Sequence, residues 1–243
     1  MRNVWIIAGR EFRLYFISPV AYTVAAMVLL ILGGIFAVNI YYGVVSGQVN
    51  PDGRMVMGPL VTILLFATPA LTMRAVADEQ RMGTIELLLT SPVRDWEMVV
   101  GKWLGAMGFM LLIVAVTWVY PLILNRLTSP GIDQGVLVSA YLGLVVMVGA
   151  MVAIGILISS LFSNPVPAFF VTLAVLLGLW IIGGFASGSG SGSEVIRYLS
   201  FVDHYYSRLY RGILDLGDVI YYLSLTVLAL FLGGQAVEAR RWR

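Results

Sequence analysis

Residues 134–193 read QGVLVSAYLGLVVMVGAMVAIGILISSLFSNPVPAFFVTLAVLLGLWIIGGFASGSGSGS and contain no Asp, Glu, Lys or Arg. A bilayer core of about 30 Å is crossed by about 20 helical residues, so this run is too long for a single crossing. Its one sharp break is SNPVP at 163–167, where two prolines disrupt a helix and Ser and Asn favour a turn. The stretch therefore predicts two membrane spans joined by a tight turn.

Four further apolar stretches without charge predict four more spans. A charge at the centre of a span costs roughly 2.5 to 3.5 kcal/mol, so the gaps between charges mark the crossings. The six predicted spans are residues 20–42, 55–73, 103–123, 136–161, 166–185 and 219–236. We therefore expect an all-α, polytopic membrane protein, with residues 1–243 forming a single transmembrane domain.

The composition agrees with lipid as the solvent of this chain. Of its 243 residues, 60% are hydrophobic and only 12% are charged, which is more apolar surface than a soluble domain of this size buries. No removable signal peptide is expected from residues 1–10. The chain has no cysteine, which excludes disulfides and thiolate metal sites, and its net charge of +2 does not suggest nucleic-acid binding.

The distribution of Lys and Arg predicts the orientation. Six crossings place both termini on one side, and that side receives ten of the fifteen basic residues: Arg2, Arg10, Arg13, Arg74, Arg81, Arg94, Lys102, Arg240, Arg241 and Arg243. The other side receives five: Arg54, Arg126, Arg197, Arg208 and Arg211. Because loops rich in Lys and Arg stay in the cytoplasm, we expect both termini there.

Residues 1–18 predict an interfacial elbow helix before the first span. Trp5, Ala8, Phe12 and Tyr15 recur at helical spacing. Ser18-Pro19 then supplies a helix N-cap and a first-turn proline, so the chain bends and enters the bilayer. The alternative is a basic flank that only fixes the topology.

The loop 74–102 carries most of the charge between two spans. Met82, Ile85, Leu88 and Leu89 form an apolar stripe, which predicts an amphipathic helix over 78–90. Ser91-Pro92 starts a second helix that runs on into the third span. Such a hairpin can dock on a cytoplasmic partner and transmit a push; the alternative is a loop that lies on the headgroups.

Motifs for catalysis are missing from the sequence. It has no G-x-x-x-x-G-K-[ST], H-E-x-x-H or G-x-S-x-G, and His204 is its only histidine. The predicted spans contain no ionisable residues that would relay protons or ions. We therefore expect no enzyme activity, no catalytic residue, no metal and no cofactor on this chain, and an energy source elsewhere.

Residues 186–217 predict an outer loop with an interfacial helix before the last span. A Gly and Ser linker at 187–193 precedes an apolar face that consists of Ile196, Leu199, Val202, Tyr206 and Leu209. Gly212 is predicted to end this helix, because glycine readily adopts the left-handed conformation that follows a helix C-terminus. His204 is expected at the interface rather than as a ligand. The segment is either a passive helix or a lid over an exit, whose residues are Arg197, Phe201, His204, Tyr205, Tyr206 and Arg208.

Two stretches carry a family resemblance. Residues 68–92 read TPALTMRAVADEQRMGTIELLLTSP, and residues 199–226 read LSFVDHYYSRLYRGILDLGDVIYYLSLT. Together with Glu11-Phe12 and Ser18-Pro19, they resemble type-2 ABC exporter permeases, and more closely the gliding-motility-associated branch. The branch name does not imply gliding, because likeness of fold or family does not fix the cargo.

The resemblance implies a permease of the bacterial plasma membrane that works as a dimer, with an identical copy or a paralogue. It also implies two copies of a separate ABC ATPase, which holds ATP and Mg, contact with membrane lipid, and an extracytoplasmic auxiliary protein as a further possible partner. In such permeases the loop after the second span couples to the ATPase; the matching residues are Glu79, Arg81, Gly83, Thr84, Glu86 and Leu87. The competing class is a membrane scaffold that moves no solute.

Overall fold

The computed structural model describes residues 2–46, 52–84, 94–128, 131–185 and 198–241. These residues form helices and turns, with no strand among them. Six helices are long and apolar enough to cross a membrane: Pro19–Ser46, Arg54–Arg81, Asp95–Leu127, Gln134–Leu161, Pro165–Phe185 and Leu216–Ala239. The prediction of an all-α protein with six spans is therefore confirmed.

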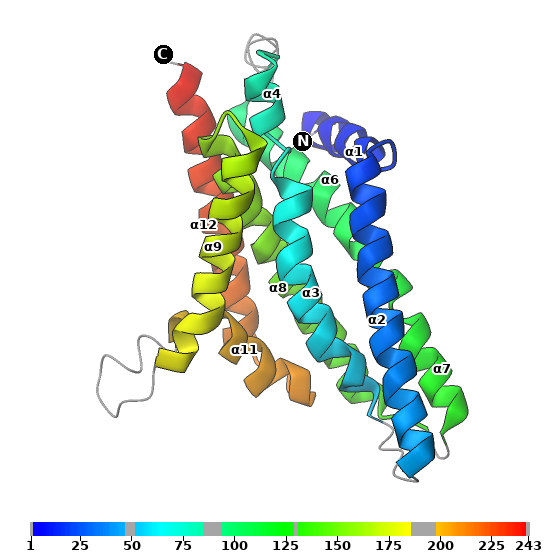
Figure 1. Ribbon diagram of the computed structural model, residues 1–243. Helices are drawn as coiled ribbons and strands as arrows, with labels where there is room; N and C mark the ends of the chain where they lie inside the picture. The colour runs from blue at the N-terminus through cyan, green and yellow to red at the C-terminus, as the bar shows by residue number, and fades with distance from the viewer. Residues whose placement is uncertain (1, 47–51, 85–93, 129–130, 186–197, 242–243) are drawn as a thin grey trace.

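The helices are named in chain order as in Figure 1. They are α1 (Arg2–Tyr15), α2 (Pro19–Ser46), α3 (Met57–Thr72), α4 (Ala77–Arg81), α6 (Asp95–Val116), α7 (Val119–Leu127), α8 (Gln134–Leu161), α9 (Pro165–Ile181), α11 (Phe201–Ser207) and α12 (Leu216–Arg241). Short 3-10 turns lie at Gly53–Val56, Ile182–Phe185 and Leu209–Arg211. Helices α1 and α4 and the end of α12 lie at one end of the bundle, here called the terminal end; α11 and the end of α7 lie towards the other, here called the distal end (Figure 1).

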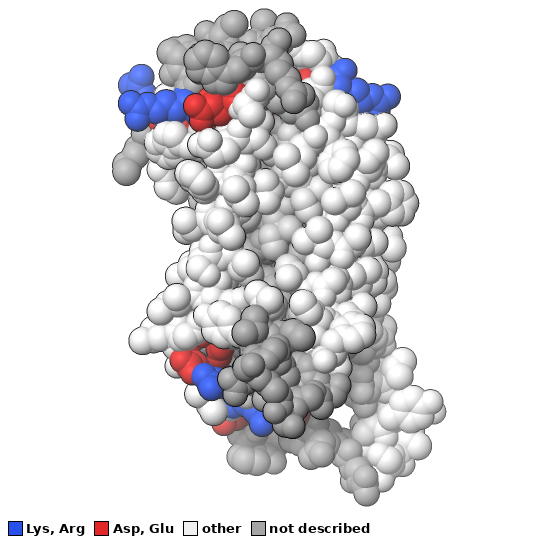
Figure 2. Space-filling view, turned by 90° about the vertical axis from the view of Figure 1, so that its left-hand side faces the viewer, with Lys and Arg blue, Asp and Glu red and all other residues white. Residues whose placement is uncertain are grey.

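Charged side chains gather at the two ends of the bundle. In Figure 2, Lys, Arg, Asp and Glu appear at the top and at the bottom, and a broad belt between them shows none. A charge exposed to hydrocarbon is expensive, so a belt of this kind is what lipid requires. The chain is a multi-pass membrane protein.

Helix α8 is the centre of the bundle and packs against α3, α6, α9 and α12. Glycines allow the close approach: a Cβ at Gly143 would lie 2.8 Å from the Cβ of Leu209, and one at Gly155 would clash with Thr72 of α3. The predicted turn after α8 is confirmed, since α8 ends at Leu161 and α9 begins at Pro165. Asn164 caps α9 by accepting a hydrogen bond from the amide of Val166 at 3.0 Å.

Helix α1 is the predicted elbow, but its buried face differs from the prediction. The side chains that it buries are Val4, Ile7, Ala8 and Glu11, whereas Trp5 is 70% exposed. The reason lies in α6, which presents three glycines to α1. A Cβ at Gly101 would lie 2.7 Å from Ile7, and one at Gly105 would lie 2.5 Å from the Cβ of Glu11. Figure 1 shows α1 lying crosswise to the spans at the terminal end.

The amphipathic helix predicted over 78–90 is wrong in its extent. Helix α4 ends at Arg81, and Gly83 adopts a φ of +70°, a left-handed conformation that terminates a helix. Residues 85–93 lie outside the described part of the chain. The second half of the prediction is confirmed from residue 95 onward, because α6 begins at Asp95 and runs without a break into the third span as far as Val116. A turn at 117–118 then leads into α7, which completes the span.

Candidate functional site

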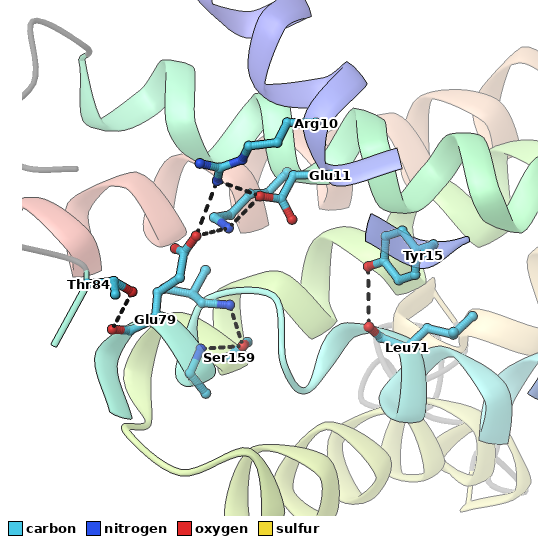
Figure 3. Close-up of polar contacts among 10 residues, drawn as sticks. Arg10, Glu11, Tyr15, Leu71, Glu79, Thr84 and Ser159 are labelled. Atoms are coloured by element: carbon cyan, nitrogen blue, oxygen red, sulfur yellow. Dashed lines mark hydrogen bonds and ion pairs between the residues drawn. The ribbon is translucent and has the colours of Figure 1, made fainter. Parts of the chain in front are cut away.

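Four charged side chains from three helices meet at the terminal end (Figure 3). The ammonium group of Lys102 on α6 lies 3.0 Å from Oε1 of Glu11 on α1 and 2.8 Å from Oε1 of Glu79 on α4. The guanidinium group of Arg10 contacts the same two oxygens, at 2.8 Å and 3.3 Å. These residues are called the ion network below, and they join the elbow, the loop after the second span and the third span.

Lys102 is the most deeply buried member of the ion network, with a side chain that is 1% exposed. A buried charge is tolerated only when it is paired, and removal of its partner is strongly destabilising. The hydrogen bond from Arg10 to Glu11 raises the pKa of the Arg10 guanidinium above its ordinary value, which keeps the network charged on that side. The three helices are therefore held together by three largely buried charges, Lys102, Glu11 and Glu79, and by the half-exposed Arg10.

The start of α4 is fixed to the end of α8 by polar contacts. The hydroxyl of Ser159 accepts hydrogen bonds from the amides of Val76 and Ala77, both at 3.1 Å, and donates one to the carbonyl of Met73 at 3.0 Å. Gln80 donates to the carbonyl of Ser160 at 2.8 Å. These contacts satisfy backbone groups where α3 gives way to α4, so the position of α4 is defined by α8 as well as by the ion network.

The structure brings together two of the six residues predicted for coupling. Glu79 belongs to the ion network, and the hydroxyl of Thr84 donates to the carbonyl of Glu79 at 3.3 Å. Arg81 is exposed and lies outside the network, and Gly83 forms the turn after α4. Glu86 and Leu87 lie outside the described residues.

Sequence reasoning missed Lys102, Glu11 and Ser159 as parts of this site. Lys102 counted only as a basic flank of the third span, although it follows seven residues of continuous helix from Asp95. A single lysine at the start of an apolar span, and a single acid within the basic helix α1, are the signals that point to a buried pair. Neither signal identifies the partner, because Glu11 is 91 positions from Lys102.

The distal segment 198–212 is a helix and a turn, but its buried face differs from the predicted one. The large side chains that it buries are Phe201, Tyr205 and Leu209. Of the predicted face, Leu209 is buried as expected, whereas Leu199 is 45% exposed and Ile196 lies outside the described residues. Gly212 is the stop that was predicted, with a φ of +93°. The segment therefore packs into the bundle through Phe201, Tyr205 and Leu209, of which only Leu209 belongs to the predicted face.

Hydrogen bonds fix the distal segment to α8 and α12. The hydroxyl of Tyr205 donates to the carbonyl of Ala140 at 3.2 Å, and that of Ser139 donates to the carbonyl of Leu209 at 3.1 Å. From α12, the hydroxyl of Tyr222 donates to the carbonyl of Phe201 at 2.6 Å. Burial raises the pKa of Tyr206, beside Tyr205, to about 12, so this ring keeps its proton. The segment is seated on the bundle at several points.

His204 was predicted as an interfacial side chain rather than a ligand, and in the structure it has defined partners. Its Nδ1 lies 2.6 Å from Oδ1 of Asp218, its Nε2 lies 2.9 Å from the carbonyl oxygen of Tyr198, and its ring stacks on Tyr221. It thus links the distal segment to the start of α12. Within residues 198–241 Arg208 pairs with Asp215, whereas Arg197 lies outside the described residues.

The described residues offer packing and ion pairing rather than reactive chemistry. No group of three or more His, Asp or Glu side chains that would hold a metal ion occurs in the part of the chain that the structure describes. What the terminal end does have is a loop, an elbow and a span held by one set of buried charges. The three elements are therefore in direct contact through these four side chains.

Comparison with known proteins identifies the family. A family model described as "ABC-2 family transporter protein" matches residues 5–233, which is nearly the whole chain. A search of curated proteins gave no match. The matched region contains α2 to α11, the ion network and most of α1 and α12. The chain belongs to the ABC-2 transporter family, as a membrane-embedded permease.

Proposed function

We propose that this chain is the permease subunit of an ATP-driven exporter in a bacterial plasma membrane, with both termini in the cytoplasm. A separate ABC ATPase, in two copies, supplies the energy, and a second permease copy or a paralogue completes the path. An extracytoplasmic auxiliary protein is a further partner in this proposal. We also propose that this chain belongs to the gliding-motility-associated branch of the family, on the basis of residues 68–92 and 199–226.

The ion network is the single observation that supports this function most strongly. Glu79 is one of the residues that the resemblance assigns to coupling, and its carboxylate is bound to Lys102 at the start of the third span. A scaffold does not need a charged loop tied to a span. A transporter does, because a push on the loop has to reach the membrane.

Force can pass along two connections from the loop. The first runs from α4 through Lys102 into α6, a continuous helix of 22 residues that enters the bundle. The second runs from α4 through Arg10 and Glu11 to the elbow, and α1 is followed directly by α2. Rigid-body movement of helices is a known way of switching a path between two states. In this proposal, closure of the ATPase dimer drives both connections together.

The distal segment keeps a proposed role at the exit of the path. Because Tyr205, Leu209 and Phe201 are tied to α8 and α12, an opening movement would have to break several buried hydrogen bonds. We infer that the segment moves together with α8 and α12 rather than swinging alone. Its contribution to gating then depends on how those two helices shift.

Purification with the energy-supplying subunit tests the proposal. The tagged full chain is isolated from its native membranes, and the preparation is assayed for an ABC ATPase and for ATP hydrolysis. We expect an ATPase at a ratio of one to one with the permease, and turnover that falls when Lys102 is replaced by Met. A stable assembly with extracytoplasmic proteins but with no ATPase would favour the scaffold and overturn the proposal.

A further inference from the structure

A cleft of about 420 Å³ lies beside the ion network at the terminal end. It is bounded by the end of α1, the start of α2, the end of α3 and α4. Its apolar walls include Leu14 of α1, Val20 of α2, and Ala70 and Leu71 of α3. The cleft therefore joins charged side chains of the terminal end to apolar side chains at the start of α2 and the end of α3. A cleft with one apolar and one charged part suits an amphipathic ligand.

The charges that line the cleft cancel. They are Arg10, Arg74, Lys102, Glu11, Asp78 and Glu79. Arg10, Lys102 and the two glutamates are engaged in the ion network. The remaining pair, Arg74 and Asp78, is open: Nε of Arg74 lies 3.7 Å from Oδ2 of Asp78, beyond hydrogen-bond distance, and both side chains are accessible to solvent. Each group therefore retains capacity for a ligand.

An open pair of opposite charges is complementary to a zwitterion. A guanidinium group binds a phosphate, and a carboxylate binds a primary ammonium group through its N–H donors. Because the lining has no net formal charge, it provides no general attraction for an anionic lipid. The apolar walls, formed by α1, α2 and α3, suit acyl chains that enter from the belt.

We propose that this cleft binds a zwitterionic membrane phospholipid with a primary ammonium headgroup, of the phosphatidylethanolamine type. Arg74 contacts the phosphate and Asp78 contacts the ammonium group. The lipid then sits against the elbow, α4 and the start of α2, next to the residues that join them. All residues that line the cleft belong to this chain, so lipid binding can be measured on the purified chain alone.

Native mass spectrometry of the full chain in detergent tests the site. Phosphatidylethanolamine, phosphatidylcholine and phosphatidylglycerol with identical acyl chains are titrated, together with soluble glycerophosphoethanolamine. We expect phosphatidylethanolamine to bind at least about tenfold more tightly than phosphatidylcholine, whose quaternary ammonium has no N–H donor. The soluble headgroup should bind more weakly than the lipid, because it lacks the acyl chains that contact the apolar walls.

Variants separate the two ends of the headgroup. Asp78→Asn should bring phosphatidylethanolamine down to the affinity of phosphatidylcholine, whereas Arg74→Gln should weaken both lipids equally. Ala70→Phe should block both by filling the cleft, and Arg13→Gln, an exposed charge outside it, should change neither. Equal binding of the two lipids, preference for phosphatidylglycerol, equal binding of the soluble headgroup, or indifference to these variants would each overturn the proposal.

Discussion

Lys102 and Glu79 are 23 positions apart in the chain, and their Nζ and Oε1 atoms lie 2.8 Å apart between α6 and α4. The same lysine binds Glu11 of the elbow. One ammonium group thus holds the loop after the second span and the elbow against the third span. Because Lys102 is almost completely buried, this relationship predicts large effects from small changes.

Lys102→Met should destabilise the protein by about 3 to 5 kcal/mol, since it leaves two carboxylates close together with only Arg10 between them. The measurement is thermal or denaturant unfolding of the purified protein in detergent. Arg81→Met is the matched control, because Arg81 is exposed and should change stability by no more than about 0.5 kcal/mol. Equal stability of the two variants would show that the ion network does not hold the helices together.

Gly105→Ala should destabilise the contact between α1 and α6 by about 1 to 3 kcal/mol through overpacking. Its Cβ would lie 2.5 Å from the Cβ of Glu11 and 3.0 Å from the carbonyl oxygen of Ala8. Gly34→Ala in α2 is the control, because its Cβ would meet nothing within 4 Å. Because alanine has a better helix propensity than glycine, Gly34→Ala should leave the stability of the protein unchanged or raise it by up to about 1 kcal/mol. The two midpoints of thermal unfolding should therefore shift in opposite directions, or only that of Gly105→Ala should fall.

Single cysteine substitutions test the orientation, because the natural chain has no cysteine that would react. Ser46 at the end of α2 and Thr128 after α7 should react with an impermeant thiol reagent added to intact cells. Ser163, in the turn between α8 and α9, should react only after the membrane is opened. From the sequence alone, a cysteine at Thr90 should be protected from the reagent in intact cells, and a cysteine at Ser189 should be labelled. Labelling of Ser163 together with protection of Ser46 would reverse the proposed orientation.

Glu86→Lys should leave insertion and abundance unchanged and should lower transport coupled to ATP hydrolysis. The expectation rests on the family resemblance, which assigns Glu86 to the contact with the ATPase. Abundance in the membrane is measured by immunoblot, and coupling by ATP hydrolysis of the co-purified complex. A complex that retains wild-type turnover and transport would remove Glu86 from the contact.

Tyr222→Phe should lower the free energy of unfolding by about 1 to 3 kcal/mol. The substitution removes the hydroxyl that donates a hydrogen bond to the buried carbonyl of Phe201. Tyr42→Phe is the control, since Tyr42 is exposed in the described structure and its hydroxyl is not part of the distal contacts. Hydrogen exchange of the amides in α11 provides a second measurement. Faster exchange in Tyr222→Phe, and not in Tyr42→Phe, would show that α12 holds the distal segment in place; unchanged exchange would contradict this.

The sequence by itself determined the number of spans and the turn between α8 and α9. Both follow from local properties: the length of an apolar run compared with the thickness of a bilayer, and the inability of proline to continue a helix. The same holds for the helix start at Pro19 and for the stop at Gly212, which are set by residues next to them in the chain. The family resemblance also rests on contiguous stretches.

Only the tertiary structure decided which faces are buried and which charges are paired. Glu11 is buried on α1 and Trp5 is not, because the glycines of α6 admit the elbow on that side and Lys102 compensates the carboxylate. In the distal segment, Phe201, Tyr205 and Leu209 turn inward because α8 and α12 supply partners for them. Pairing across helices depends on where they cross, and periodicity along one helix does not contain that information.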